Sequence, residues 1–557
     1  MDATEITKQL SELKIKPSEI PDEGLAKAFT ILLQIIEATH LENEQLKDEI
    51  KYLKQRLKDD NDASDNNTDK KQARKDHSSE DERKKRKAPK KKKKRKSKKD
   101  KIRIDRTEHC EVDKSILPED AEFKGYKDVI VQEIVIKTDN VLYKKEIYYS
   151  AGEKKTYIAN LPDGVQGEYG PGINSLVPII KHVCNMSEPK IAEFFDNFGI
   201  CISQPTISRK LTKSHDVEIF HEEKEEIFKA GLNSSEDHGI DGTGSIVKGQ
   251  NHHVQIVCNP HYTAYFTCEH KDRLSIVDIF LCGSPRRYFF NKEAIYLLET
   301  FRVSRKWISR IMEEAFDKFL DEEQIQLMLE DFFPEPGKGK NLRLRIMEAG
   351  AIAYYHYQTE TPVIKNLLSD NAPEYKRITE NNGLCWIHDG RSYKALNPIV
   401  PVNQEELDLF LNCYWDYYQS LLDYKKDPSP LKAEKLSLEF DEIFSTQTDY
   451  PALDNRIQKT KAKKEGMLLV LKYPEIELHN NASELGARAQ ARKRDVSLHT
   501  MSDEGTKSQD TFLTITQTAK KLGVNIYDYI FDRISGKYEL PSLASLIPQP
   551  MPCHNTE

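Results

Sequence analysis

Three acidic residues occupy positions from which carboxylates could bind metal ions. Asp241 lies in a predicted strand between small residues (IDGTG), Asp370 ends the predicted strand NLLSD, and Glu484 falls in the first turn of a predicted helix. Magnesium takes oxygen ligands, commonly one or two carboxylates with water and phosphate. Two such ions about 4 Å apart can activate an attacking oxygen and stabilise a leaving one. The three acids therefore suggest metal-dependent phosphoryl transfer if the fold brings them together, although an Asp at a strand end is ordinary taken singly.

Alternating apolar residues predict the elements that would position these acids. Strands are expected in HGIDGTGSIV, HHVQIVCN, TAYFTCE, PVIKNLLSD and GLCWIH. Helical patterns cover 273–332, 403–425 and 430–446, with further helices in APEYKRITE and NNASELGARAQARKRD, the latter starting at Asn480 or Asn481. Three antiparallel strands followed by alternating helices and strands is the order of a ribonuclease-H-like domain. We therefore predict an α/β protein with a ribonuclease-H-like mixed sheet over 231–500 and helical insertions near 300–350 and 400–470.

A helix-turn-helix candidate precedes this domain, within a helical region over 166–230. In MSEPKIAEFFDNFGICISQPTISRKL, Ser187 and Ser203 can cap two helices that Gly199 separates. The second helix carries short polar and basic side chains that suit a DNA major groove, namely Gln204, Thr206, Ser208, Arg209 and Lys210. An ordinary helical hairpin explains the pattern about equally well.

The N-terminal segments predict a pairing helix and a basic linker. Within residues 1–60, a heptad stripe runs through Leu32, Ile36, Thr39, Asn43, Leu46, Ile50, Leu53 and Leu57. The stripe favours a two-stranded coiled coil over a helix that packs on its own chain. Residues 61–106 have too few apolar side chains to fold, so we expect a disordered linker. Its basic tract, 83–101, should bind phosphates without sequence preference through residues that include Lys90, Lys92, Lys94 and Arg95.

Two further segments complete the predicted organisation. Residues 107–165 predict a small β-rich module with a turn at 138–140, and residues 501–557 predict a C-terminal helical element and tail.

Composition argues against several classes of protein. No apolar run is long enough to span a membrane, and the N-terminus MDATEITKQL lacks the pattern of a secretory signal. The nine cysteines form no C-x-x-C pair, which disfavours a disulfide framework and a zinc ribbon. The formal net charge of −7 combines the basic tract with an acidic remainder. That balance is compatible with an enzyme that gathers carboxylates around metal ions.

The C-terminal part of the chain resembles the end of the Insertion Sequence 66 family of bacterial DDE transposases. The segment HNNASELGAR is similar to the family's D-N-N-x-x-E-R-x-L-R motif, which gives Glu484 the catalytic place and Arg488 that of the later Arg. CWIHDGR resembles the family's C-W-x-H-x-R-R motif through His388 and Arg391, and LLSD and DGT resemble the motifs of the two catalytic Asp residues. The resemblance covers roughly 24–60 and 165–535.

The resemblance implies a DNA transposase that cuts the 3′ ends of a mobile element and joins them to target DNA. Asp241, Asp370 and Glu484 would hold two Mg²⁺ ions, for which Mn²⁺ can substitute, and His388, Arg391 and Arg488 would contact phosphate near them. The implied partners are terminal inverted repeats, target DNA, further copies of the chain in a dimer or higher oligomer, and accessory transposition proteins. The implied location is the bacterial cytoplasm, at the nucleoid.

The chain departs from the family pattern at several points. The paired cysteines of the family's zinc module are absent before residue 165, so that module is not carried over. Gly242 replaces an acidic residue, and Leu485 replaces an Arg.

Three other functions stay open on the same residues. A transposase-derived regulator would keep the DNA-binding helices and lose metal binding. A ribonuclease-H-like nuclease would cut DNA without joining it. A coiled-coil scaffold would leave the three carboxylates apart. For His388, a structural role at the end of the strand GLCWIH competes with a role at phosphate.

Overall fold

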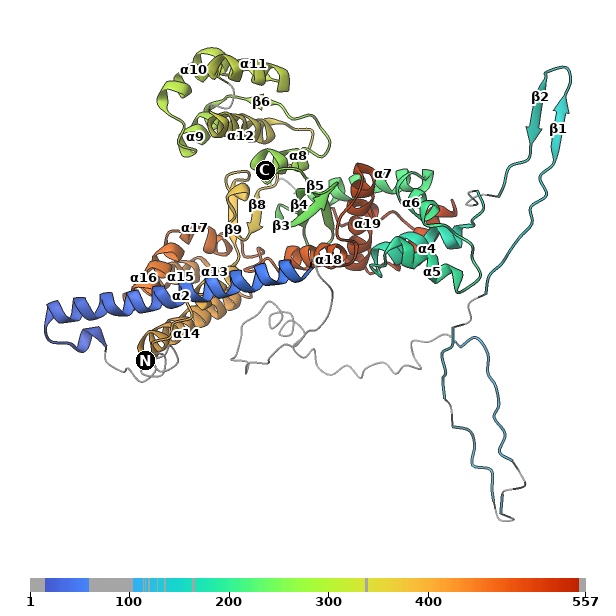
Figure 1. The fold of residues 1–557 in the computed structure, drawn as a ribbon, viewed down its shortest axis with the longest axis horizontal. Coiled ribbons are helices and arrows are strands. Elements are labelled where there is room, and N and C mark those ends of the chain that lie inside the picture. Colours follow the sequence, from blue (N-terminus) through green and yellow to red (C-terminus); the bar gives the residue numbers. More distant parts are fainter. Residues whose placement is uncertain are drawn as a thin grey trace.

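The computed structural model describes residues 16–59 and 104–549, except for 114, 116, 119–120, 128, 135–136, 163–164, 166 and 336–338. In helix α2 (Glu23–Asp59), the side chains of 41, 44, 45, 48 and 51–59 are not described. The basic tract with Lys90, Lys92, Lys94 and Arg95 lies outside the described residues. The protein is mixed α/β, with one mixed sheet surrounded by many helices (Figure 1).

The central sheet has five strands in the order β5–β4–β3–β8–β9. β3 pairs antiparallel with β4, as does β4 with β5, whereas β8 is parallel to both β3 and β9. The strands are β3 (Asp237–Val247), β4 (Gln250–Cys258), β5 (Thr263–Cys268), β8 (Asn366–Ser369) and β9 (Asn381–Leu384). All five predicted strands are present, but the last is displaced. It ends at Leu384, and helix α13 (Trp386–Lys394) takes up the rest of GLCWIH.

The two faces of the sheet are covered by different helices. Ile240, Val257 and Leu367 point into the largest core, which α7 (His215–Asn233), α8 (Arg273–Phe280) and α12 (Lys340–Tyr357) share. The opposite face receives α18 (Asn481–Ser497), whose Ala487 packs near Ile256 and Tyr265. The sheet therefore has a mainly apolar side and a side that carries the predicted acids.

Helix α19 (Asp503–Leu522) closes the free edge of β5. The backbone N–H groups of Thr263, Tyr265 and Thr267 donate to side-chain oxygens of Thr518, Thr514 and Asp510. These acceptors recur every four residues and so lie on one helix face, while the donors recur every two residues along a strand edge. The helix thus satisfies groups that an exposed edge would offer to other strands. The described part of the predicted C-terminal element, 501–549, packs on the main body through α19, α20 (Ile526–Ile534) and α21 (Leu543–Leu546).

Two helical insertions lie in the ranges where helices were expected, and the first of them interrupts the sheet. The first lies between β5 and β8 and adds α9 (Lys292–Thr300), α10 (Arg305–Ala315), α11 (Glu322–Phe332) and the small strands β6 (Tyr288–Phe289) and β7 (Phe319–Leu320). The second follows α13 and contains α14 (Pro401–Tyr424), α15 (Pro430–Ile443), α16 (Pro451–Lys461) and α17 (Lys464–Met467). An aromatic core around Trp386 and Tyr414 joins α13 to the second insertion.

Helix α2 packs on this second insertion. Leu33 is buried against Val400 and Val402, and the Glu37 carboxylate accepts backbone N–H groups of Ile399 and Val400 at the start of α14. Packing on its own chain, the alternative to a coiled coil, is thus realised on one face. Along the predicted heptad stripe, Leu32, Leu46 and Ile50 are each about half exposed. The coiled coil therefore stays a prediction.

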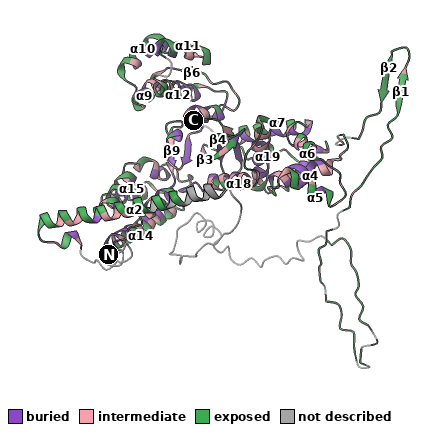
Figure 2. Cartoon of the chain, viewed as in Figure 1, coloured by how far each residue is buried: buried purple, intermediate pink, exposed green. Residues whose placement is uncertain are grey.

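The segment 107–165 holds much less regular structure than predicted. Its described residues include one two-stranded hairpin, β1 (Ile147–Ser150) and β2 (Lys155–Ile158), whose turn lies at 151–154 and not at 138–140. The apolar side chains there are largely exposed, as Figure 2 shows along the projecting hairpin. Alternation alone does not produce a sheet when no neighbouring strand covers the apolar face. Separately, no helix in the described part of the chain is long and apolar enough to cross a membrane.

Candidate active site

Asp241 and Asp370 lie level with each other on two neighbouring strands. β3 and β8 run parallel with Gly239 opposite Leu368, so two residues further along each strand Asp241 comes level with Asp370, which directly follows β8. Residues two apart in a strand point to the same face. Adjacent strands are about 4.8 Å apart, so the fold brings these two distant acids together.

Helix α18 places Glu484 over the same face of the sheet. A Cβ atom on Gly239 would lie 2.7 Å from Ser483 Oγ, and one on Gly486 would lie 2.7 Å from Ile256 Cγ2. Two glycines therefore let the helix approach the sheet closely. The side-chain amide of Asn480, at the helix start, donates to the carbonyl of Ile240 at 2.7 Å.

The three acids interact electrostatically. Burial raises the pKa of Asp241 to about 6, and the negative charges of Asp370 and Glu484 add to the rise. The backbone N–H of Gly242 donates to Asp241 at 2.8 Å and acts in the opposite direction. A cation placed among these carboxylates would relieve the same repulsion.

Arginine side chains from two helices surround Glu484. Arg391 on α13 places Nη1 and Nη2 at 3.2 and 3.5 Å from the two carboxylate oxygens of Glu484. Arg488, one turn further along α18, lies 3.9 Å away. Both arginines therefore form ion pairs with Glu484, and their expected contact with phosphate stays a prediction.

The thiol of Cys385 fixes α13 relative to α18. Its buried sulfur accepts the backbone N–H of His388 at 3.4 Å and that of Asn480 at 3.3 Å. The backbone N–H of Trp386 also donates to the carbonyl of Leu478 at 2.9 Å. The first turns of the two helices therefore meet, which explains why Arg391 and Glu484 come together.

His388 lies in the first turn of α13, where it is exposed. The expectation that it closes a strand is wrong, because β9 ends at Leu384. The apolar run GLCWI has no period that separates a short strand from the start of a buried helix. A role for His388 at phosphate stays a prediction.

Sequence reasoning missed Lys271, which lies between β5 and α8 beside the acids. Its ammonium group pairs with Glu374 at 2.9 Å. The hydrogen bond to Glu374, together with the charges of Asp370 and Asp241, raises the pKa of Lys271. The surrounding sequence, EHKDR, gave no sign of this position, because a single Lys in a charged turn is ordinary.

The side chains of the three acids do not converge on a single point in this structure. Among the described residues, no three His, Cys, Asp or Glu side chains form a group that could hold a metal ion as they stand. Asp241, Asp370 and Glu484 share a face, but Glu484 is engaged by Arg391.

The segment predicted as a helix-turn-helix forms α5 (Glu188–Asp196) and α6 (Gln204–Thr212), which share a small core with α4 (Pro171–His182). Its role in DNA binding stays a prediction. Ser203 caps α6 by accepting the backbone N–H of Thr206, and Gly199, in the turn that follows α5, has a positive φ of 71°. Gln204 and Arg209 are exposed, while Thr206 and Ser208 are half-buried. Lys210 instead contacts its own module, donating to Asn174 at 2.6 Å and lying over the ring of Tyr169.

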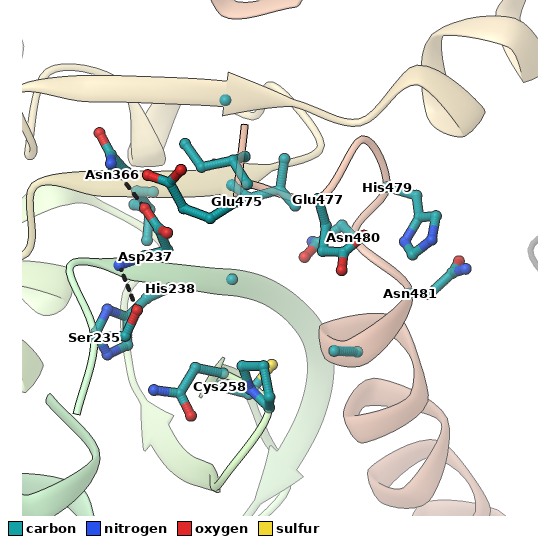
Figure 3. Close-up of a pocket in the computed structure, with 18 of the residues that line it drawn as sticks. Ser235, Asp237, His238, Cys258, Asn366, Glu475, Glu477, His479, Asn480 and Asn481 are labelled. Carbon is teal, nitrogen blue, oxygen red and sulfur yellow. Dashed lines mark hydrogen bonds between the residues drawn. The ribbon is translucent and has the colours of Figure 1, made fainter. Parts of the chain in front are cut away.

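A cavity of about 430 Å³ lies near the N-terminal ends of β3 and β8, whereas Asp241 and Asp370 lie further along these strands (Figure 3). Asp237 accepts a hydrogen bond from Asn366 there, and His238, Glu475 and Asn480 also line the cavity. Asp241, Asp370 and Glu484 do not line it. The cavity therefore lies beside the acidic site without containing its acids, and Gly239 and Asn480 belong both to its wall and to the support of α18.

Comparison with known proteins identifies a relative. The chain is 30% identical over 313 residues to a protein of Sinorhizobium fredii (strain NBRC 101917 / NGR234) described as "Uncharacterized protein y4jO". The match covers 55% of this chain and 94% of the relative, so the chain belongs to the same family as that protein. No protein-family model matches the chain, and no solved structure matches it.

Proposed function

We propose that this chain is a DNA transposase of the DDE type and a divergent member of the Insertion Sequence 66 family. The observation that carries the proposal is the placement of Asp241, Asp370 and Glu484 on one face of the sheet, where the last two act on the pKa of the first. In an inert scaffold, three neighbouring carboxylates would repel one another without any compensating function. The strand order β5–β4–β3–β8–β9, with β4 antiparallel to its neighbours, supports a ribonuclease-H-like fold.

The donor set fits magnesium. Carboxylate oxygens are the hard ligands that Mg²⁺ takes, and Asp241, Asp370 and Glu484 would hold the ions, with Mn²⁺ as a substitute. When bound, two such ions supply Lewis-acid activation of the attacking oxygen and stabilise the leaving oxygen. The raised pKa of Asp241 supports this assignment, because it reflects a buried carboxylate near two others.

The cationic residues around the acids support DNA as the substrate. Arg391, Arg488 and Lys271 lie near the acidic face and carry charges that suit a phosphate backbone. At the module formed by α4–α6, the exposed Gln204 and Arg209 would contact the terminal repeat. The acids would thus hold the cations, and the basic side chains would position the strand.

Cleavage of an element end tests the proposal. A duplex carrying the terminal repeat is incubated with Mg²⁺ and the wild type, Asp370→Asn or Glu484→Gln. We expect strand cleavage by the wild type and a loss of about two orders of magnitude or more in each variant, since several kcal/mol of transition-state stabilisation disappear. Asp237→Asn is the matched control, because Asp237 lies on the same face of β3 and outside the proposed ligand set.

Joining must be measured separately from cutting. Pre-cut ends are offered with a supercoiled target, and the proposed transposase should produce joined products that require the same acids. Cleavage without joining would favour the nuclease, and repeat binding without either reaction would favour the regulator.

A further inference from the structure

We propose that Arg391 is a displaceable counter-ion for Glu484, which it holds until divalent cations bind and then leaves for a DNA phosphate. This inference rests on the proposed function and assigns a regulatory step to the same site. It concerns the ion pair between Arg391 on α13 and Glu484 on α18.

The geometry of the pair is that of a fork on a carboxylate. The two terminal nitrogens of Arg391 face the two oxygens of Glu484 at 3.2 and 3.5 Å. The Glu484 side chain is 17% exposed and that of Arg391 is 47% exposed. The oxygens that would bind a cation are thus occupied by a group that is itself open to solvent.

Exposure makes Arg391 replaceable. Its distances to Glu484 exceed the roughly 2.7–2.9 Å of a strong charge-assisted hydrogen bond. No other ion-pair partner of Arg391 is found in the part of the chain that the structure describes. Asp389, two residues earlier, shows the opposite case. It is buried and held by Arg456 and Lys463 within the helical insertion. When the Arg391 side chain turns away, the main interaction that it loses is therefore the ion pair with Glu484.

The exchange has a direction that follows from charge. A guanidinium stays protonated at any working pH, so it competes with a divalent cation for the carboxylate and also repels that cation. Once a cation satisfies Glu484, the freed guanidinium can make a bidentate contact with phosphate. Removing Arg391 should therefore strengthen metal binding and weaken DNA binding, two effects of opposite sign.

Metal binding without DNA is the first test. Titration calorimetry with Mn²⁺ compares the wild type with Arg391→Gln, Arg391→Lys and the control Arg492→Gln, an exposed arginine two turns from Glu484 on α18. We expect Arg391→Gln to bind Mn²⁺ about three- to tenfold more tightly, Arg391→Lys to fall between it and the wild type, and the control to change less than about twofold. Unchanged or weaker binding by Arg391→Gln would overturn the inference, as would tighter binding by the lysine variant than by the glutamine variant.

DNA binding with a non-catalytic ion is the second test. With a short duplex oligonucleotide and Ca²⁺, Arg391→Gln should bind about three- to tenfold more weakly than the wild type, and without divalent ions the two should bind alike. Equal affinity in Ca²⁺ would overturn the inference. Circular dichroism and thermal unfolding of each variant verify that it is folded.

Glu484→Gln and Asp241→Asn separate this inference from the function on which it rests. If Mn²⁺ binding does not depend on these acids, the proposed metal site is wrong, and the inference fails with it. If binding requires the acids but ignores Arg391, only the inference fails.

Discussion

Asn480 donates a hydrogen bond from its side-chain amide to the backbone carbonyl of Ile240, the residue before Asp241, at 2.7 Å. The bond joins the start of the helix that carries Glu484 to the strand that carries Asp241. It connects two segments that lie 240 residues apart in the sequence. The distance between the acids therefore depends on a side chain that is not itself acidic.

Asn480→Ala should weaken metal binding because α18, which carries Glu484, is no longer held in place against β3. The buried carbonyl of Ile240 loses its donor, which costs on the order of 1–3 kcal/mol of stability, and the start of α18 becomes free to shift. We expect weaker Mn²⁺ binding and a lower cleavage rate while all three acids are retained. Calorimetry and urea unfolding measure the two effects, and wild-type Mn²⁺ affinity in a destabilised variant would show that the bond is purely structural.

Gly486→Ala should separate α18 from the sheet. The added Cβ would lie 2.7 Å from Ile256 Cγ2, closer than any ordinary contact, and overpacking of this kind costs roughly 1–3 kcal/mol. The double variant with Ile256→Ala removes the opposing methyl group. In a double-mutant cycle, the combined loss should therefore be smaller than the sum of the two single losses. Additive losses would contradict the close contact.

Asp241 should reduce the stability of the metal-free protein at neutral pH. Its pKa is raised from 3.8 to about 6 in the folded chain, so between these values the folded state binds more protons than the unfolded state. The free energy of unfolding must then fall as pH rises through this window. Asp241→Asn should be more stable than the wild type at pH 7.5 by on the order of 1–3 kcal/mol, and this difference should shrink towards pH 4. Urea unfolding at both pH values checks this, and a difference independent of pH would be contrary to the assignment.

Arg209→Ala should weaken binding of the terminal repeat. Arg209 is exposed on α6. Loss of a base contact would cost about 1–3 kcal/mol of binding free energy, whereas loss of a phosphate contact would reduce the slope of log affinity against log salt concentration by about one. Lys190→Ala on α5 is the control, because Lys190 is exposed and paired with Glu193 in its own helix. A gel-shift titration at several salt concentrations measures both variants. Equal losses in the two variants would place the DNA elsewhere.

Much of the sheet was predictable because its signals are local. Alternation and turn residues located β3, β4 and β5, and the strand-end position of Asp370 and the helix-start position of Glu484 were readable from their neighbours. The boundary at Trp386 was not, because an apolar run of that length suits a strand or a buried helix equally. The placement of α2 on the second insertion depends on Leu33 meeting Val400, a contact that no local pattern encodes.

The acidic residues of the site could be predicted from the sequence, but the residues that hold or neighbour them could not. Asp241, Asp370 and Glu484 have the residue types and element positions that metal chemistry requires. The pairing of Arg391 with Glu484, the double acceptance by the Cys385 sulfur and the position of Lys271 arise from tertiary packing. Single side chains in such roles carry no periodic or compositional signal.

Anomalous diffraction from crystals of the full chain grown with Mn²⁺ tests the central claim most directly. The account predicts an anomalous peak within coordination distance of carboxylate oxygens of Asp241 and Asp370, on the face covered by α18, with Glu484 turned towards it. A peak that avoids these acids, or Mn²⁺ bound elsewhere while Asp241 and Asp370 stay unliganded, would contradict it.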